Sequence, residues 1–165
     1  YLDTWHYQDS IVLLGDAAHA MVPFHGQGMN CAFEDCLAIV KAIESESNWN
    51  SAIASYEQQR QANALAIQEM ALENYLEMRD KVDDPQFLLQ RALERRLAEL
   101  HPTQFIPRYS MVSFQLIDYA IAQSRGSIQR QILQTLTQGK TDIAEVDFEL
   151  ASKLIHQQLE PIQYD

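Results

Sequence analysis

The sequence predicts a mainly helical fold with one short strand near its N-terminus. Apolar residues recur at intervals of three and four along most of the chain, a spacing typical of helices. No glycine or proline interrupts residues 51–82. The apolar run Ile11–Leu14 is short enough for a strand, and it leads directly into the glycine-rich segment Gly15–Asn30. We therefore expect a buried strand and a turn at the N-terminal end, followed by helices.

The first long helix is expected over residues 28–45. Its predicted inward face consists of apolar residues at helical spacing, namely Met29, Ala32, Phe33, Cys36, Leu37, Val40 and Ile43. A polar stretch follows, and a second helix is expected over residues 51–82, with Val82 at the end of its apolar stripe. We expect residues 1–45 to be the end of one domain and residues 46–165 to form a helical region.

The remaining helices are predicted from caps and helix breakers. Asp84 followed by Pro85 is a helix start signal, and that helix should run to about residue 99. The next helix is expected from Ser110 or Met111, with an interruption at Arg125–Gly126 and a continuation to Gly139. Thr141 or Asp142 is the expected cap of the last helix.

The composition excludes several classes of partner. The formal net charge of −11 disfavours binding to nucleic acid and to anionic lipid, both of which need Lys and Arg. No apolar run approaches the roughly 20 residues that cross a bilayer. Cys31 and Cys36 lie five residues apart in one predicted helix, a spacing that favours free thiols in a reducing compartment. We therefore expect neither a nucleic-acid nor a membrane partner.

The segment Gly15–Asn30 has the properties of a ligand-binding turn. The first N–H groups of a helix have no partner within it, and the helix dipole leaves partial positive charge there. Gly26 and Gly28 lack a Cβ, so a flat ligand could approach the backbone closely. Asp16 could accept from ligand hydroxyls, although Asp is also common in turns for local reasons. His19 and His25 with Asp16 are too few ligands for a metal site, so none is expected.

The pattern Gly-Asp-Ala-Ala-His, then Pro and Gly-Gln-Gly-Met-Asn, resembles the second flavin-binding motif of the FAD-dependent aromatic hydroxylases. The resemblance implies that Asp16 binds the ribityl chain and that the turn lies against the isoalloxazine. The residues it assigns to FAD are Asp16, Gly26, Gln27, Gly28, Met29 and Asn30.

Three blocks, residues 21–31, 74–80 and 109–114, are similar to the branch of this family that hydroxylates kynurenine. The substrate-binding residues that this resemblance implies are Pro23, Phe24, His25, Asn74, Met78 and Tyr109. The first three would form a wall of the aromatic pocket, which Met78 would also line. Asn74 would hydrogen-bond the amino-acid group of L-kynurenine, and Tyr109 would donate to its carboxylate. A bond from Asn74 to backbone and a plain core role for Tyr109 are the alternatives.

The resemblance also implies a reaction and an architecture. NADPH would reduce FAD, dioxygen would form a flavin C4a-hydroperoxide, and one oxygen atom would pass to the ring of L-kynurenine to give 3-hydroxykynurenine. The family has an α/β, Rossmann-like FAD-binding fold that begins with a G-x-G-x-x-G turn, which this sequence lacks. We therefore expect the C-terminal part of a cytoplasmic enzyme of the soluble bacterial type, inactive without its N-terminal half.

Two other functions fit the same residues. The chain could belong to a flavin hydroxylase that acts on another aromatic acid. It could also be a non-catalytic helical interaction module in which the Gly-Gln-Gly turn is only structural. A bound flavin would exclude the interaction module. The Michaelis constant for kynurenine would distinguish a hydroxylase of kynurenine from a hydroxylase of another aromatic acid.

Overall fold

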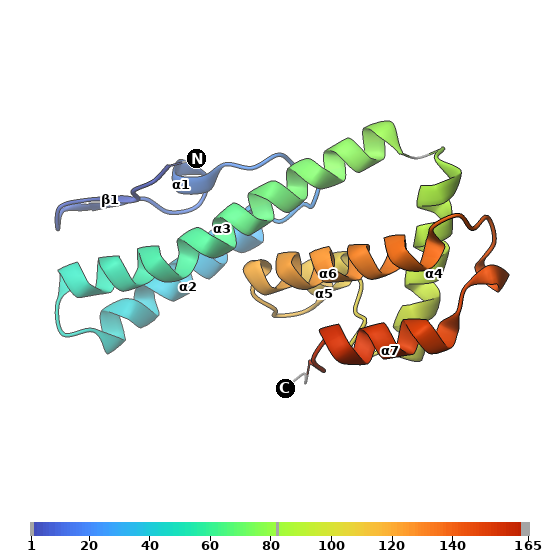
Figure 1. The fold of residues 1–165 in the computed structure, drawn as a ribbon. Helices are drawn as coiled ribbons and strands as arrows, with labels where there is room; N and C mark the ends of the chain where they lie inside the picture. Colours follow the sequence, from blue (N-terminus) through green and yellow to red (C-terminus); the bar gives the residue numbers. More distant parts are fainter. Residues whose placement is uncertain (1, 82, 163–165) are drawn as a thin grey trace. The chain divides into compact units, whose positions relative to one another are not determined.

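The fold is known from a computed structural model that describes residues 2–81 and 83–162; Val82 lies outside them. The chain divides into two compact units, Tyr1–Tyr75 and Leu76–Asp165, which are treated separately below. Among the described residues, helices predominate, and the strands form one two-stranded antiparallel sheet (Figure 1). The prediction of a mainly helical chain with a short N-terminal strand is thus confirmed.

The first unit begins with a β-hairpin. Strands β1 (His6–Tyr7) and β2 (Ile11–Val12) pair in antiparallel register, with His6 opposite Val12. The sequence predicted only the second strand and predicted it as buried, but Ile11 is exposed. In a two-stranded ribbon only one face is covered, so alternate side chains meet solvent.

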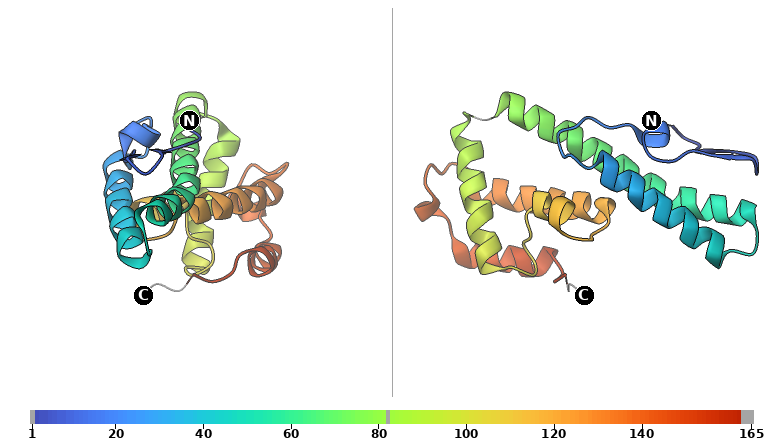
Figure 2. Two further views of the ribbon diagram at one scale, coloured as in Figure 1. Left: turned by 90° about the vertical axis from the view of Figure 1, so that its left-hand side faces the viewer. Right: turned by 180° about the vertical axis from the view of Figure 1, so that it is seen from behind.

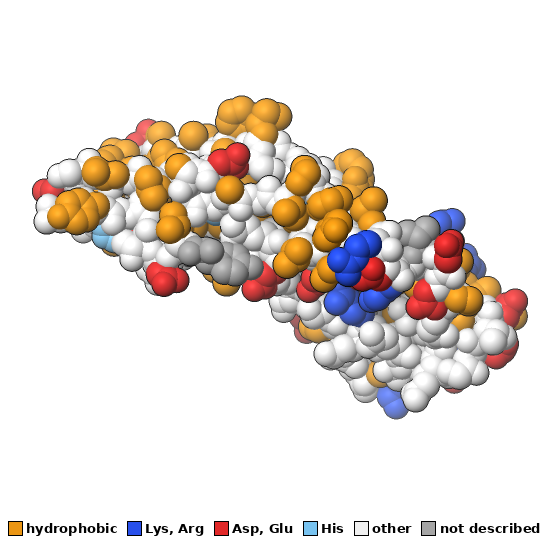
Figure 3. Space-filling model, turned by 90° about the horizontal axis from the view of Figure 1, so that it is seen from above, with side chains coloured by type: hydrophobic (Ala, Val, Ile, Leu, Met, Phe, Trp, Pro, Cys, Tyr) orange, Lys and Arg blue, Asp and Glu red, His pale blue; other side chains and the backbone are white. Residues whose placement is uncertain are grey.

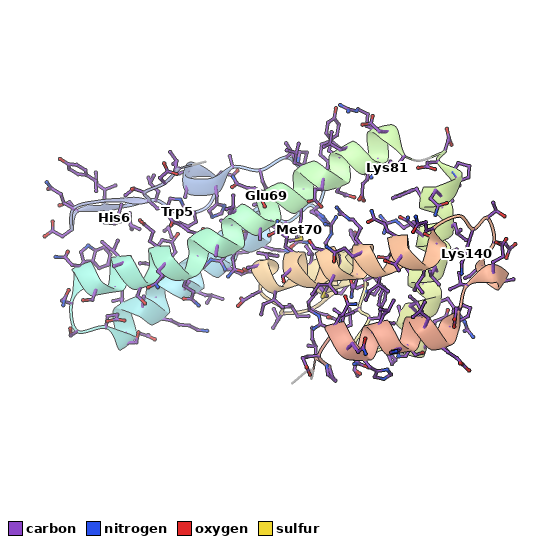
Figure 4. The ribbon with its side chains drawn as sticks, in the orientation of Figure 1. Trp5, His6, Glu69, Met70, Lys81 and Lys140 are labelled. Carbon is purple, nitrogen blue, oxygen red and sulfur yellow. The ribbon has the colours of Figure 1, made fainter. Side chains whose placement is uncertain are left out.

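The hairpin is held along a long helix, α3 (Trp49–Asp80). The backbone N–H of Trp5 and the ring Nδ1 of His6 both contact Glu57 Oε2, at 2.9 and 2.6 Å. The hydroxyl of Tyr56 donates to the carbonyl of Leu13. Figure 4 shows Trp5 and His6 on the N-terminal segment, which lies beside α3, and Figure 3 shows many hydrophobic side chains on the surface of this unit.

A short helix, α1 (Asp16–His19), follows the hairpin, and helix α2 (Gly28–Ser45) begins after the glycine-rich turn. The predicted bounds of α2 are confirmed. Helices α2 and α3 lie side by side and run in opposite directions (Figures 1 and 2). The core of this unit is rich in alanine, and small side chains allow helices to approach closely. One hydrophobic cluster of this core consists of Trp5, Ala18, Ala38, Ile39, Ala42, Ala52, Tyr56 and Ala64.

The predicted inward face of α2 is wrong for this chain. The large side chains of that face are exposed, with exposed fractions from 47% for Ile43 to 68% for Met29. The buried face lies on the opposite side and contains Cys31, Asp35, Ala38, Ile39 and Ala42. The sequence analysis chose the bulkier of two apolar stripes, whereas α3 packs against the one with smaller side chains.

The second unit consists of the end of α3 and four further α-helices. These are α4 (Pro85–Leu100), α5 (Arg108–Phe114), α6 (Tyr119–Thr137) and α7 (Phe148–Gln158), with a 3₁₀ turn, η1 (Ile143–Glu145), before the last. Helix α6 packs against α4, α5 and α7. The core is aliphatic and aromatic: Leu93, Leu97, Phe105, Ile132, Leu133, Leu136, Val146, Ala151, Ile155 and Leu159.

The helix caps of this unit agree only in part with the sequence. Asp84 caps α4 as predicted, since its carboxylate accepts from the Gln86 N–H at 2.9 Å. Asp142 caps η1, whereas α7 is capped by Asp147, which the sequence analysis did not single out. Both are Asp residues that accept from backbone N–H groups of the first turn, the usual geometry of an N-cap.

The predicted interruption at Arg125–Gly126 is also wrong. The break falls between α5 and α6, at Gln115–Asp118, and α6 continues through Gly126. A Cβ added to Gly126 would lie only 2.6 Å from Cδ of Arg108 on α5. The glycine permits close contact between two helices and does not end one.

Among the described helices, none has both the length and the hydropathy that crossing a bilayer requires.

Candidate cofactor site

The site is built on the turn between β2 and α1. Gly15 has φ +56°, a conformation that residues with a side chain rarely adopt. A Cβ added to it would also lie 3.0 Å from the Cβ of Ala32 on α2. Its N–H donates to Oδ2 of Asp35, at 2.9 Å. The turn is thus fixed by a backbone conformation, a close contact and a buried hydrogen bond.

The N-terminus of α2 faces this turn. Gly26 has φ +66°, and no described atom lies within 4 Å of the position its Cβ would take. Gln27 is the N-cap residue, and among the described residues it makes no side-chain hydrogen bond to the helix backbone. Its amide instead accepts from Asn30 Nδ2 at 2.8 Å. The N–H groups of the first turn are therefore not covered by a side-chain cap.

Asp16 is exposed and lies beside the same turn. Its Oδ1 is 3.9 Å from the position of a Cβ added to Gly28, the first residue of α2. The structure thereby brings together an exposed carboxylate, an open glycine and an uncapped helix N-terminus. A carboxylate can accept from hydroxyls, and a helix N-terminus attracts electron-rich groups. Of the other predicted flavin residues, Gln27 is buried and Met29 is exposed.

Under the turn lies a buried cluster of charged side chains, which we call the Asp35 cluster: His19, Asp35 and Arg60. His19 Nε2 lies 2.5 Å from Asp35 Oδ2, and Arg60 Nε donates to Asp35 Oδ1 at 2.7 Å. Arg60 also pairs with Glu34 at 2.9 Å. All three residues of the cluster are at most 5% exposed. The carboxylate that anchors Gly15 is thus itself held by two cationic partners.

The hydrogen bonds of the cluster decide its protonation state. Burial alone would lower the pKa of His19, but the hydrogen bonds to Asp35 and Cys31 outweigh burial and raise that pKa to about 10. Burial would raise the pKa of Asp35, yet the hydrogen bonds from His19 and Arg60 hold it below its ordinary value. At neutral pH the cluster therefore contains an imidazolium, a carboxylate and a guanidinium.

The cluster also bears on metal binding. Ligand atoms of His19, Cys31 and Asp35 lie within 4.8 Å of one another, a grouping that the sequence analysis did not find. However, the guanidinium of Arg60 already contacts both Asp35 and Cys31 Sγ, the latter at 3.3 Å. The geometry is that of an internal ion cluster.

Sequence reasoning missed Asp35 and Arg60, although a signal for each was present. Arg60 continues the spacing of Ile53 and Tyr56 on α3, so it had to share their inward stripe. Asp35 lies on the small-residue face of α2, which was taken as the outer one. Two opposite charges on facing inward stripes indicate a buried ion pair, because an unpaired buried charge is very costly.

The predicted substrate wall, Pro23–His25, is tied to α3. Asn74 Nδ2 donates to the Phe24 carbonyl at 2.8 Å, and the rings of Phe24 and Tyr75 lie 4.7 Å apart. His25 is buried, while Pro23 and Phe24 are exposed. Asn74 and the wall are therefore in contact. The bond that Asn74 makes is to backbone, which the sequence analysis had left open as an alternative.

Met78 and Tyr109 belong to the second unit. Both side chains are more than half exposed, at 57% and 51%, and the rings of Tyr109 and Phe114 meet edge to face at 5.9 Å. A plain core role for Tyr109, one of the two alternatives, is thereby wrong. Met78 lies four residues after Asn74 on α3, so the two residues lie on the same side of the helix.

Known proteins match this chain in two ways: a family model matches the segment that contains the turn, and individual relatives match almost the whole chain. Residues 1–71 match the FAD binding domain family. Over 161 residues, 98% of this chain, the sequence is 54% identical to the kynurenine 3-monooxygenase of Xanthomonas campestris pv. campestris strain B100. The chain is homologous to kynurenine 3-monooxygenases. The corresponding proteins of Xanthomonas euvesicatoria pv. vesicatoria strain 85-10 and Xanthomonas oryzae pv. oryzae strain PXO99A are each 53% identical over the same length.

The resemblance to flavin-dependent aromatic hydroxylases is thereby confirmed, and FAD is the cofactor of the matched family. The chain spans about a third of the length of these relatives, 35% in each case. The FAD match covers the hairpin, the glycine-rich turn, α2 and most of α3.

Proposed function

We propose that this chain is the C-terminal portion of an FAD-dependent monooxygenase that hydroxylates L-kynurenine to 3-hydroxykynurenine, with NADPH as cosubstrate. The observation that carries the proposal is the site formed by Asp16, Gly28 and the N-terminus of α2. Homology over 98% of the chain supports the same activity.

The residues present fit a flavin. The position of a Cβ on Gly26 is open, so a planar ring can approach the backbone there without a clash. The uncapped N-terminus of α2 can receive an electron-rich carbonyl, and partial positive charge at that end favours negative charge that develops on it. The exposed carboxylate of Asp16 can accept from the ribityl hydroxyls. Residues Gly26–Asn30 would hold the ring, and Asp16 the chain.

When bound and reduced by NADPH, FAD would supply activated oxygen from dioxygen, chemistry that amino-acid side chains do not provide. The chain's own residues would bind and orient the substrate. The Pro23–His25 wall and Met78 would contact its ring, while Asn74 and Tyr109 would fix its polar end. Exclusion of water by this wall would protect the activated oxygen from loss.

The proposal extends to the parts of the enzyme that complete the site. The remainder of the polypeptide would supply the Rossmann-like half of the flavin domain and the guanidinium that pairs with the substrate carboxylate. Residues 1–45 would end the flavin domain, and residues 46–165 would form the helical region over the substrate. The enzyme would act in the cytoplasm, and the 165-residue chain by itself would be inactive.

The test is substitution of Asn74 in the full-length enzyme. Asn74→Ala should raise KM for kynurenine by about 10-fold or more, because a hydrogen bond to a charged group is worth roughly 1.5–3 kcal/mol. Gln68→Ala is the matched control, since Gln68 also donates from α3 to a loop carbonyl, that of Ala20 at 2.8 Å. It should leave KM unchanged.

Flavin content, read from the absorbance of the purified protein, separates the alternatives. A colourless full-length protein would contradict the proposal and favour a helical interaction module. A yellow protein in which Asn74→Ala leaves KM for kynurenine unaffected would favour another aromatic acid as substrate.

A further inference from the structure

Helix α2 has two apolar faces, and the residues that the structure describes cover only one of them. The covered face, described above, contacts the N-terminal segment and α3. The second face, which we call the outer face, is formed by Met29, Phe33, Cys36, Leu37, Val40 and Ile43. These residues follow one another at intervals of one, three or four, so at 100° per residue they occupy about a third of the helix circumference.

Most polar residues of α2 lie in a narrow strip between the two faces, and Glu44 lies within the outer face near the end of the helix. Asn30, Glu34, Lys41 and Ser45 fall within this strip. An ordinary surface helix has one apolar stripe, with polar residues over the rest of its circumference. A helix with apolar faces on both sides is typical of the interior of a larger body. Five large apolar side chains in one row also form a patch of the kind that marks an interaction site.

The geometry points to one occupant: the outer face of α2 packs against the part of the same polypeptide that completes the flavin-binding domain. This inference rests on the proposed function. Helix α2 lies wholly within the segment that matches the FAD binding domain family, residues 1–71. Its relatives share almost the entire chain but are about three times as long, so they contain enough additional polypeptide to cover a helix face.

Charge argues against a membrane as the occupant. Helices that lie on membranes carry Lys and Arg beside their apolar face. The single basic residue of α2 is Lys41, against Glu34, Asp35 and Glu44, and the net charge of the chain is −11. An uncharged partner surface rich in apolar side chains fits the outer face better.

Two cysteines make the inference testable. Cys36 lies in the middle of the outer face and is exposed in this chain, whereas Cys31 is fully buried on the opposite face. In the full-length holoenzyme, Cys36 should react with a maleimide at least about 100-fold more slowly than in the urea-unfolded protein, because protection requires opening of a packed interface. Peptide mapping by mass spectrometry would follow each thiol separately, with Cys31 as the protected reference.

Rapid labelling of Cys36 in an enzyme that binds flavin and turns over would overturn the inference and leave the proposed function intact. Slow labelling in a protein that binds no flavin would contradict the proposed function alone. Slow labelling that becomes fast on dilution, together with a fall in molar mass, would show that a second copy covers the face and would also overturn the inference.

A pair of substitutions gives an independent measurement. Leu37→Glu, on the outer face, should lower the Tm of the full-length protein by about 5 °C or more, since it places a charge in an apolar interface. Lys41→Glu introduces the same residue four positions further along, in the polar strip, and should shift Tm by less than about 2 °C. Equal shifts for the two variants would overturn the inference.

Discussion

The interior of the first unit contains a carboxylate, a guanidinium and an imidazolium, whereas the core cluster of the second unit is built from Leu, Ile, Val, Ala and Phe side chains. In the part of the chain that the structure describes, the core cluster of the second unit contains no charged side chain. Buried ion pairs are weak stabilisers, because desolvation of the charges offsets much of their attraction. We therefore attribute to the Asp35 cluster a positioning role more than a stabilising one. Asp35 accepts a hydrogen bond from the Gly15 N–H and thereby fixes the turn that carries Asp16.

The largest effect is expected from removing the central charge of the Asp35 cluster, which tests the difference between the charged interior of the first unit and the aliphatic core of the second. Asp35→Asn leaves the positive charges of His19 and Arg60 in the interior without their shared partner. The free energy of unfolding should fall by about 3–5 kcal/mol, the usual cost of breaking a buried pair from one side. Urea unfolding measures the loss, and flavin content should fall with it. Unchanged flavin content in a folded Asp35→Asn variant would show that the cluster does not control the turn.

The protonation of His19 predicts a pH dependence of the first unit. The pKa of His19 rises from 6.5 to about 10 on folding, so its contribution to stability is complete below pH 6.5 and is lost as the pH rises through 10. The neighbours that raise the pKa of His19 are the carboxylate of Asp35 and the side chain of Cys31, with Arg60 on the far side of the carboxylate. The urea midpoint should fall between pH 7 and pH 10 in the wild type. The Asp35→Asn variant should lack most of this dependence; an equal dependence in both would assign it to another group.

A substitution in the aliphatic core of the second unit is the counterpart of Asp35→Asn in the first. Leu97 is fully buried, and Leu97→Ala should lower the free energy of unfolding by about 3 kcal/mol through lost contacts and a cavity. Leu88, on the same helix, is about half exposed, and Leu88→Ala should cost less than about 1 kcal/mol. Neither change should add a pH dependence. If Leu97→Ala altered flavin content at constant stability, the distinction between the two interiors would be wrong.

The smallest expected effect concerns the contact between α5 and α6. Gly126→Ala improves helix propensity by about 1 kcal/mol, yet the new Cβ would meet the Arg108 side chain at Cβ, Cγ and Cδ. The contact involves the inner part of that side chain, so we expect a net destabilisation of about 1 kcal/mol in urea unfolding. The exposed neighbour Ser127 provides the control, because Ser127→Ala should be neutral or slightly stabilising. A stabilised Gly126→Ala variant would mean that Arg108 can move away without cost.

The elements that could be predicted from the sequence were those with local signals. Helix α2 and the cap of α4 at Asp84 follow from spacing and from hydrogen bonds within one turn. The break between α5 and α6 could not be predicted, because the role of Gly126 depends on Arg108, 18 residues away. Likewise, the spacing of α2 alone could not show which of its two apolar faces meets α3.

The residues of the candidate site likewise divide into those with a local sequence signal and those that depend on distant parts of the chain. The turn residues Asp16 and Gly26–Asn30 were found because they are contiguous and form a known pattern. Asp35 and Arg60 come from different helices, 25 residues apart, and neither belongs to that pattern. A search for opposite charges on facing inward stripes would have found them, once the correct face of α2 was known.

Gly15 limits what mutational scanning can reveal about this site. Its positive φ and its 3.0 Å approach to Ala32 each exclude a side chain, in the presence or absence of any ligand. Intolerance at this position would be scored as a sign of cofactor contact, although its origin is steric. Tolerance at Gly28 is more informative, because its φ is not positive and an added Cβ would meet Asp16 Oδ1 and Met21 Cγ only at 3.9 Å, so a flavin would be the neighbour that a side chain displaces.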